Sequence, residues 1–527
     1  MKRRLAIVSA VLALFLAPHA SAFAACSNPA GTAGEVIYSD TQKIIQYCDD
    51  ANWVRMNRTP GSGSGGCAGP AAAEGEMIYN SDFRVMQVCA GNVWRAVGPV
   101  GGGSNNKWAR INSGRIHNCG IKNDGTLWCW GRGEFGRLGN GSESYHYTPG
   151  QTSAGGAWSR VAPGGNHTCG IKADGTLWCW GRNADGQLGD GTTTQQLDPV
   201  QESSASTWKE VSAGGNHTCA IKSDDTLWCW GDDTNGQLGN GAGTTADQPD
   251  PVQESSASAW KAVSAGNSFT CAIKTDDTLW CWGKDSDGQL GNGGASADAS
   301  DPTQESTAGT WKAVSAGNIH ACGIKTDDTA RCWGDDSSGQ IGNGSGSSAD
   351  QQSPVALSGG GTWLSIAAGN LHSCGVKTNG TLWCWGSDTN GQVGNGATTG
   401  DRVSPVQEST GGTAWTSVTI GNQGDTSCGL RSDGLTLCWG SGGGNGMQGD
   451  NGEAVGGQAR NDAPELPVVG GSVWKAITTG HAHSCGIRND GTLWCWGSDG
   501  SGVLGNGGGR LPPPRQRRCR YPAAARG

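Results

Sequence analysis

The sequence is short of charged residues and of long apolar runs. Only 16% of its 527 residues are charged, and 35% belong to the set AVILMFWYC. Beyond residue 25 no apolar stretch approaches the 20 or so residues that a membrane-spanning helix needs, so we expect no membrane span in the mature chain. A strict glycine at every third position is also missing, which excludes a collagen-like triple helix.

Glycine, tryptophan and cysteine are abundant instead, with 92, 24 and 21 residues respectively. A glycine inside a helix costs about 1 kcal/mol relative to alanine, so a mostly helical protein is excluded. Disordered chains are poor in aromatic residues, so the tryptophan content excludes disorder as well.

Residues 1–25 have the features of a cleavable signal peptide. Three basic residues at 2–4 precede an apolar run from Leu5 to Ala17, and small residues follow as far as Ala25. The run is too short to cross a bilayer, and the small residues suit a signal peptidase. We therefore expect a protein that is secreted, periplasmic or on the cell surface. A lipoprotein acceptor at Cys26 is the alternative, although Phe23 suits it poorly.

The charge is distributed unevenly along the chain. Residues 509–527 form an aberrant basic Pro/Arg tail that interrupts a repeat, which indicates either a basic binding tail or an artefactual end. Without the six arginines of this tail and the three basic residues of the signal, 28 basic residues remain against 46 acidic ones. A body with this acidic excess would be repelled by phosphate backbones, so we expect no nucleic-acid partner.

The main feature of the sequence is a unit that recurs eight times between residues 98 and 508. The segments 167–181 and 217–231 differ at only three positions. A tryptophan about ten residues upstream introduces each copy: Trp108, Trp158, Trp208, Trp260, Trp311, Trp363, Trp415 and Trp474. Repeats of about 50 residues indicate a solenoid, a propeller or an array.

Each unit contains a hairpin whose register can be counted. Apolar and other residues alternate on both sides of 173–175, which is the period of a strand, and Gly175 suits a left-handed loop position. With 173–175 as the loop, Ile171 faces Leu177, Gly170 faces Trp178 and Cys169 faces Cys179. We expect Gly170 to leave room for the indole of Trp178. Asp replaces the loop glycine at 225, 277 and 328, at a modest cost.

Four short strands per unit, apolar on both faces, predict sheets stacked radially about an axis. We therefore predict an all-β fold, a β-propeller of seven to eight four-stranded blades. The repeated His, Asp-Gly hairpin, Trp-Gly, Asn and Gly-Gln-Leu-Gly pattern resembles the regulator of chromosome condensation repeat family, in a secreted bacterial type with one disulfide per repeat. That family forms seven-bladed rings, so eight units leave the blade number open.

A second, shorter repeat precedes the propeller. Residues 26–59 and 67–97 each carry two cysteines 22 positions apart and a similar Gly-Glu-x-Ile-Tyr segment, and a Gly/Ser-rich linker at 60–66 separates them. We predict two small disulfide-stapled β modules.

The cysteines pair by repeat symmetry. In an exported chain such pairs predict disulfides. The predicted bonds are Cys26–Cys48, Cys67–Cys89, Cys119–Cys129, Cys169–Cys179, Cys219–Cys229, Cys271–Cys281, Cys322–Cys332, Cys374–Cys384, Cys428–Cys438 and Cys485–Cys495, which leaves Cys519 over. Zinc is the rival, but its sites gather four ligands, and each unit offers only two.

The remaining polar motifs favour structural roles. We predict that six recurring histidines are buried and hydrogen-bonded to the backbone: His117, His167, His217, His320, His372 and His483. The Asx-rich loops, such as 233–236, lack the closing Glu of a calcium loop, so we assign them to turns. We predict no catalytic residue, no metal site and no cofactor.

The function we predict is non-catalytic binding. Variation between units is concentrated at 142–157, 242–248, 294–300, 345–353, 397–404 and 441–463. Variable loops on a rigid scaffold form binding surfaces, so we expect a monomer that contacts an unknown protein or glycan, an inhibitor being one specific form of this hypothesis. The alternatives are the guanine-nucleotide exchange activity that the resemblance implies, and an exported hydrolase or lyase.

Overall fold

The computed structural model describes residues 107–441 and 473–506, except for 205, 242–244, 295, 347, 397–399 and 422–423. It also describes the backbone of short strands within residues 25–96, at 460–461 and at 517–518. The predicted signal peptide, the linker and most of the basic tail lie outside the described residues. By its contacts the chain divides into residues 1–106 and 107–527.

The first unit contains three small antiparallel sheets. Their strands are β1 (Ala25–Ser27) with β2 (Ala30–Thr32), then β3 (Val36–Ser39), β4 (Ile44–Cys48) and β5 (Trp53–Arg55), and finally β6 (Met77–Asn80), β7 (Val85–Ala90) and β8 (Val93–Ala96). The predicted bonds Cys26–Cys48 and Cys67–Cys89 lie outside the described residues and stay predictions.

The second unit is a propeller of eight four-stranded blades, which confirms the predicted fold class and settles the blade number at eight. Blade 1 consists of β9 (Trp108–Ser113), β10 (His117–Lys122), β11 (Leu127–Gly131) and β12 (His146–Gln151). The only helical element within the described part of 107–506 is the 3₁₀ turn η2 (Glu134–Gly136).

Blades 2 to 8 repeat this order. Their first strands are β13 (Trp158–Pro163), β17 (Trp208–Ala213), β21 (Trp260–Ala265), β25 (Trp311–Ala316), β29 (Trp363–Ala368), β33 (Trp415–Ile420) and β37 (Trp474–Thr479). The second strands are β14 (His167–Lys172), β18 (His217–Lys222), β22 (Phe269–Lys274), β26 (His320–Lys325), β30 (His372–Lys377), β34 (Thr426–Arg431) and β38 (His483–Arg488). The third strands are β15 (Leu177–Gly181), β19 (Leu227–Gly231), β23 (Leu279–Gly283), β27 (Ala330–Gly334), β31 (Leu382–Gly386), β35 (Thr436–Ser441) and β39 (Leu493–Gly497). The fourth strands are β16 (Gln196–Gln201), β20 (Gln248–Gln253), β24 (Ala299–Gln304), β28 (Gln351–Ala356), β32 (Arg402–Gln407), β36 (Arg460–Asn461) and β40 (Arg517–Arg518).

The counted hairpin register is the one observed. Between β14 and β15, Ile171 pairs with Leu177, Gly170 with Trp178 and Cys169 with Cys179. The turn residues Asp225, Asp277 and Asp328 have φ of 72°, 71° and 68°, so they do adopt the left-handed conformation of the glycine that they replace.

The space above Gly170 is filled by the indole of Trp158, and not by that of Trp178 as we expected. A Cβ added to Gly170 would lie 2.8 Å from the ring of Trp158, on the first strand of the same blade. Trp178 instead lies under the Lys172 ammonium, 3.7 Å from its ring centroid. Pairing alone therefore predicted the wrong occupant, because an indole reaches diagonally across the sheet.

Eight disulfides join the facing cysteines of the second and third strands, one in each blade. The two Cα atoms of each pair lie 4.0 to 4.2 Å apart. The sulfur atoms are buried in the sheet face that packs on the next blade.

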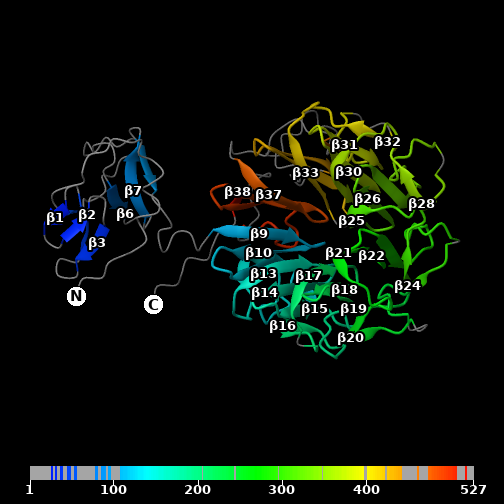
Figure 1. Cartoon of the computed structure of the whole chain (residues 1–527), viewed down its shortest axis with the longest axis horizontal. Helices are drawn as coiled ribbons and strands as arrows, with labels where there is room; N and C mark the ends of the chain where they lie inside the picture. Colours follow the sequence, from blue (N-terminus) through cyan, green and yellow to red (C-terminus); the bar gives the residue numbers. More distant parts are fainter. Residues whose placement is uncertain are drawn as a thin grey trace. The chain divides into compact units, whose positions relative to one another are not determined.

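Each blade buries this disulfide face against the tryptophans of the following blade. Cys169 and Cys179 of blade 2 form one buried cluster with Trp208 and Trp230 of blade 3. The last joint has the same composition, because Cys485 and Cys495 of blade 8 pack with Trp108 and Trp130 of blade 1. Figure 1 shows the two blades side by side, with β9 and β10 in cyan and β37 and β38 in orange. The ring is therefore closed by side-chain packing between blades 8 and 1.

Removing one disulfide is expected to lower stability without opening the ring. In the double variant C271A/C281A, the unfolded chain regains the entropy of a ten-residue loop, and we expect a loss of about 2 to 3 kcal/mol. Thermal unfolding under non-reducing conditions measures the effect. The matched control is C519A, which should melt like the wild type. Equal melting of C271A/C281A and the wild type would contradict the structural role of the bond.

Candidate functional site

The antiparallel order of the strands gives the ring two different faces. In blade 1 the loop from β9 to β10 (114–116) and the loop from β11 to β12 (132–145) lie on one face, which we call the loop face. The hairpin turn at 123–126 and the connection at 152–157 lie on the opposite face. The variable stretches predicted from sequence at 242–248, 294–300, 345–353 and 397–404 end in fourth strands, and their described residues before those strands lie on the loop face. The stretch 142–157 includes strand β12, and most of 441–463 lies outside the described residues.

A belt of backbone hydrogen bonds surrounds the axis on the loop face. The amides of Gly165 and Gly215 donate to the carbonyls of Gly214 and Gly266 in the next blade, at 3.2 Å each. The belt crosses the closing joint, because the amide of His481 donates to the carbonyl of Arg115 at 3.0 Å. A Cβ on Gly214 would come within 2.6 Å of the Gly266 oxygen, so this close approach requires glycine.

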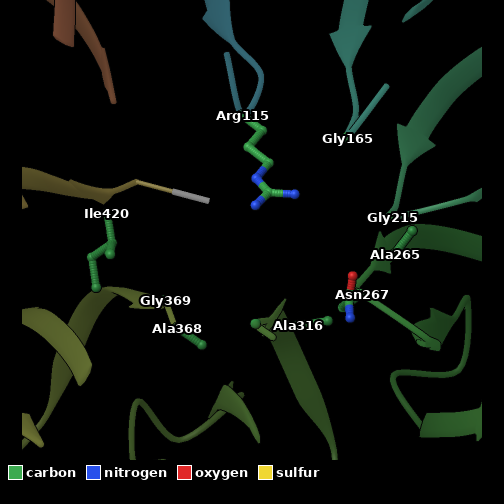
Figure 2. A pocket seen from close by; sticks show the side chains of 11 residues that line it. Arg115, Gly165, Gly215, Ala265, Asn267, Ala316, Ala368, Gly369 and Ile420 are labelled. Carbon is green, nitrogen blue, oxygen red and sulfur yellow. The ribbon is translucent and has the colours of Figure 1, made fainter. Parts of the chain in front are cut away.

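A pocket of about 170 Å³ lies inside this belt. Its lining comes from seven blades and consists of glycine and alanine apart from Arg115, Asn267 and Ile420. Figure 2 shows the Arg115 side chain extending into the opening, with Ile420 and Asn267 on other blades around it. The pocket is therefore a small polar cavity with one cationic side chain.

Arg115 breaks the symmetry of the ring. At its position the other blades carry Gly165, Gly215, Asn267, Asn318, Asn370 and, next to it across the closing joint, His481. The internal repeats are otherwise nearly identical at the axis, so this side of the pocket has a distinct chemistry. Our sequence analysis missed Arg115, and the available signal was a charged residue at a position where other units have glycine or asparagine.

A second arginine, Arg137, lies beside the pocket at a position where blades 2 to 6 have glutamine. The side chain is fully buried, with Nε donating to the Glu134 carbonyl at 2.9 Å and Nη1 3.5 Å from the carbonyl of Gly165, which lines the pocket. Its Nη2 has no hydrogen-bond partner. Burial, followed by the charges of Arg132 and Arg115 among its neighbours, lowers the pKa of Arg137 to about 10. Neither Arg115 nor Arg137 forms an ion pair within the described part of the chain.

The rim of blade 1 also carries exposed aromatic rings. Phe135, in η2, is 36% exposed and has a φ of 62°, and Tyr147 is 40% exposed. Blades 2 to 4 have Asp185, Asn235 and Asp287 in place of Phe135. Blade 1 therefore departs from the other blades both at the axis and at the rim.

The predicted histidines form a second belt, and their partners differ from the prediction. All six are fully or almost fully buried, as expected. Each Nε2, however, bonds a side-chain oxygen of the next blade: Thr168, Thr218, Thr270, Ser373, Ser427 or, across the closing joint, Asn118. The Thr168 hydroxyl donates to the carbonyl of Arg137, so it accepts from His117, which fixes a neutral Nε2–H tautomer. The prediction of a backbone partner was wrong.

One joint shows that each histidine and its partner act as a pair. Blade 4 has Phe269 in place of the histidine, and blade 5 has Ala321 in place of the hydroxyl residue. Both are completely buried in one cluster. Donor and acceptor are lost together, as expected where an unpaired buried polar group is costly.

The pocket has one charged side chain, Arg115, in an otherwise neutral lining. Within residues 107–506, apart from the gaps given above, no group of three or more His, Cys, Asp or Glu side chains is placed to hold a metal ion. The pocket lining includes no carboxylate, imidazole, thiol or hydroxyl side chain. No helix of the described chain is both long and apolar enough to cross a membrane.

Comparisons with known proteins agree with this architecture. Two family models, each described as the regulator of chromosome condensation (RCC1) repeat, match the chain. One matches residues 124–171, 174–221, 224–273 and 276–324, and the other 108–137, 158–187, 208–237, 260–289, 311–340, 363–392 and 474–503. Together they cover more than half of the chain.

Among curated relatives, the ultraviolet-B receptor UVR8 of Arabidopsis thaliana is 30% identical over 249 residues, which are 46% of this chain and 54% of the receptor. The probable E3 ubiquitin-protein ligase HERC6 of Homo sapiens is 32% identical over 163 residues, which are 30% of this chain and 16% of the ligase. The chain thus spans about half or less of the length of these relatives.

Among solved structures, human WBSCR16 has a TM-score of 0.55 at 18% identity, covering 71% of this chain and 99% of that one. Prp20p from Saccharomyces cerevisiae, whose structure was described together with its binding to Gsp1p and histones, has a TM-score of 0.55 at 20% identity, covering 73% and 94%. At these identities the likeness shows the fold alone.

The histidine belt is expected to make stability depend on pH. Burial lowers the pKa of His320 to about 4, below its unfolded value of about 6.5. The folded state therefore binds fewer protons than the unfolded state between these pH values, and His320 destabilises the fold as pH falls through them. The variant H320F/S373A has the residues of the Phe269–Ala321 joint and no histidine to protonate. Relative to the wild type, its free energy of unfolding should rise by about 1.4 kcal/mol for each pH unit as the pH falls from 6.5 to 4.

Unfolding measured between pH 4 and 8 checks this difference. The single variant S373A is the control, because it leaves the buried His320 Nε2–H unpaired and should cost about 1 to 3 kcal/mol near neutral pH. A difference between H320F/S373A and the wild type that does not change with pH would refute the neutral, buried state of His320.

Proposed function

Because the chain belongs to the regulator of chromosome condensation (RCC1) repeat family, we propose that it is a non-catalytic binding protein that holds a protein partner on its loop face. The observation that carries the proposal is the pair Arg115 and Arg137, two guanidinium groups that form no ion pair within the described residues of an acidic protein. An acidic side chain of the partner would enter the pocket and meet Arg115.

The electrostatics of the pocket support this choice of ligand. A buried guanidinium is costly unless a counter-charge compensates it, and Arg137 has an unpartnered Nη2. Arginine pairs with carboxylates through two parallel hydrogen bonds, which are stronger than neutral ones. The acidic excess outside the pocket would repel other anions, so the charge pattern favours one acidic residue presented within a complementary protein surface.

Exposed aromatic rings on the rim of blade 1 would add apolar contacts with the partner to the single ion pair of the pocket. Phe135 and Tyr147 lie on blade 1, which also provides Arg115. Aromatic residues and arginine are enriched at the energetic centres of protein interfaces. The absence of acid–base or nucleophilic groups from the pocket lining favours this reading over a hydrolase or lyase.

The disulfides support an extracellular or periplasmic location. One bond per blade is typical of proteins that fold in an oxidising compartment. This disfavours a nucleotide-exchange role on a cytosolic GTPase. The loop face could also serve an inhibitor that binds its target protein there. A glycan is the main alternative ligand.

Charge reversal at Arg115 is expected to weaken binding of the partner. We propose capture of secreted and cell-surface proteins on immobilised wild type, R115E and K312E, followed by affinity measurement with the retained protein. K312E reverses a charge on the opposite face, where Lys312 pairs with Asp328. Arg115 is exposed in the free chain and would be covered only by the partner. Truncating one member of a charge pair that an interface buries costs about 2 to 5 kcal/mol, so R115E should bind at least about tenfold more weakly, with K312E unchanged.

Three results would contradict the proposal. R115E could bind as well as the wild type, K312E could lose the partner equally, or the wild type could retain only glycans. Chemical turnover of any retained ligand would also exclude the non-catalytic function.

A further inference from the structure

Among blades 1 to 6, four loops of the loop face share a set of polar residues that the other two lack. Between the third and fourth strands, blades 3 to 6 have the series Asp, Asn, Asp at three fixed places. The members are Asp233, Asn240 and Asp247; Asp285, Asn292 and Asp298; Asp336, Asn343 and Asp350; and Asp388, Asn395 and Asp401. Blade 2 has Asn183, Asp190 and Gln195 at these places, and blade 1 has Gly133, Asn140 and Tyr145. The two aspartates therefore occur together or not at all in blades 1 to 6.

Blade 2 shows what surrounds the first of these positions. The Oδ1 atom of Asn183 accepts the Leu188 amide at 3.0 Å. Its Nδ2 donates to Asp190 Oδ1 at 3.1 Å and to the carbonyls of Thr192 and Thr194 at 2.9 and 3.0 Å. The amide nitrogen is thus surrounded by oxygen atoms.

Blade 4 places an oxygen where blade 2 has that nitrogen. Asp285 Oδ1 accepts the Leu290 amide at 3.0 Å, so Oδ2 takes the orientation of the Asn183 amide nitrogen. Asp285 is completely buried, and Oδ2 has no hydrogen-bond partner. The same holds for Asp233 and Asp336, whose Oδ1 atoms accept amides at 3.1 and 3.2 Å and whose Oδ2 atoms are buried without a partner.

The second aspartate adds a like charge beside this atom. Asp298 Oδ1 accepts the backbone amide of Asp285 at 2.9 Å, so the second carboxylate lies next to the residue that carries the first. Burial raises the pKa of Asp285 to about 6, and the charge of Asp298 acts in the same direction. The amide of Asn292 opposes this shift, but it is neutral and cannot compensate the second carboxylate. Two ionised carboxylates in this arrangement are unfavourable unless a cation lies between them or one of them binds a proton.

Blade 6 contains its own cation. Arg402 Nε lies 3.7 Å from Asp388 Oδ2. Blades 3, 4 and 5 have Gln248, Ala299 and Gln351 in place of Arg402. In blade 4 the neighbouring Lys284 is directed to Asp287, at 3.9 Å. Three loops therefore lack a cation at the place of Arg402. In blade 3 the positive charge that acts on Asp247 is that of Arg182 in blade 2, which is paired with Asp185.

We propose that the loops of blades 3, 4 and 5 each bind one Ca²⁺ ion between the two aspartates: Asp233 and Asp247, Asp285 and Asp298, and Asp336 and Asp350. The donors are all oxygen, which suits a hard cation. Each site has two carboxylates and takes its remaining ligands from main-chain oxygens and water, as calcium with its flexible coordination allows. Asp247, Asp298 and Asp350 are exposed, so the ion reaches its site from solvent. From the sequence, these loops were assigned to turns because they lack the closing Glu of a calcium loop whose ligands follow one another along the chain.

The test is calorimetric titration of the mature, oxidised protein, freed of metal with EDTA and then dialysed, with CaCl₂ and with MgCl₂. We expect about three calcium ions per chain, with dissociation constants of about 10⁻⁴ to 10⁻³ M as in extracellular modules, and weaker binding of magnesium. The melting temperature should rise with calcium and not with NaCl of equal ionic strength. This outcome does not depend on the proposed partner, because no partner is present.

Two variants make the assignment specific. D285N restores the asparagine of blade 2 and should reduce the calcium stoichiometry from three to two. D401N changes the matching aspartate of the arginine-filled blade and should leave the stoichiometry at three. Three results would overturn the proposal: no binding at 10 mM calcium, an equal loss in D401N and D285N, or undiminished binding in the triple variant D233N/D285N/D336N. Stabilisation by lowering the pH to 5 without any effect of calcium would assign the carboxyl pairs to a shared proton instead.

Discussion

The burial of each blade's disulfide face by the tryptophans of the next blade determines the rest of this structure. In blade 2 this face carries Cys169, Cys179 and Leu177, and blade 3 covers it with Trp208 and Trp230. The two indoles meet edge to face, with ring centroids 5.8 Å apart, and Trp230 Nε1 donates to the Gln187 carbonyl of blade 2. Neither face can be buried within its own blade, so each blade depends on both neighbours.

Because every blade must bury its two faces in the same way, the packing between blades is nearly the same around the ring. Residues that depart from the repeat are therefore candidates for function. Arg115, Arg137 and Phe135 all belong to blade 1. Their side chains replace the glycine or asparagine, the glutamine and the small polar residues that blades 2 to 6 have at these places, while the Arg137 carbonyl still accepts the repeated bonds from Thr168 and Trp180. The paired aspartates of blades 3 to 5 lie on the same face but in the loops between the third and fourth strands. A rigid ring thus carries two kinds of local chemistry, a cationic pocket at the axis and acidic loops around it.

Much of the fold could be predicted from the sequence because it depends on local spacing. A period of two and a loop at 173–175 were sufficient to place Cys169 opposite Cys179, and the tolerance of aspartate for positive φ explained Asp225. Contacts between blades could not be predicted in this way, because they join residues of different units. The partner of His117 is Thr168, 51 positions away, and no pattern within one unit indicates it. The prediction that Trp178 lies above Gly170 was wrong for a related reason. Strand pairing does not fix the direction of an indole, and Trp158 takes this space.

The pocket was missed because its residues are separated along the chain and few of them carry chemistry. Glycine and alanine in seven loops convey no binding signal one at a time, and Arg115 stands alone among them. The blade number was also undetermined, because eight units are compatible with either a ring of eight or a ring of seven with one unit displaced. The cluster that joins Cys485 and Cys495 to Trp108, together with the hydrogen bonds between blades 8 and 1, shows that all eight take part.

Hydrogen exchange at the joint between blades 8 and 1 tests the closed eight-bladed ring most directly. The amide of Trp108 donates to the Gly491 carbonyl at 2.9 Å, as the amide of Trp208 donates to Gly175 at 2.8 Å within the array. The account predicts that the amides of Trp108 and His481 are protected to the same extent as that of Trp208. Fast exchange at Trp108 and His481, with Trp208 still protected, would show an open ring and contradict it.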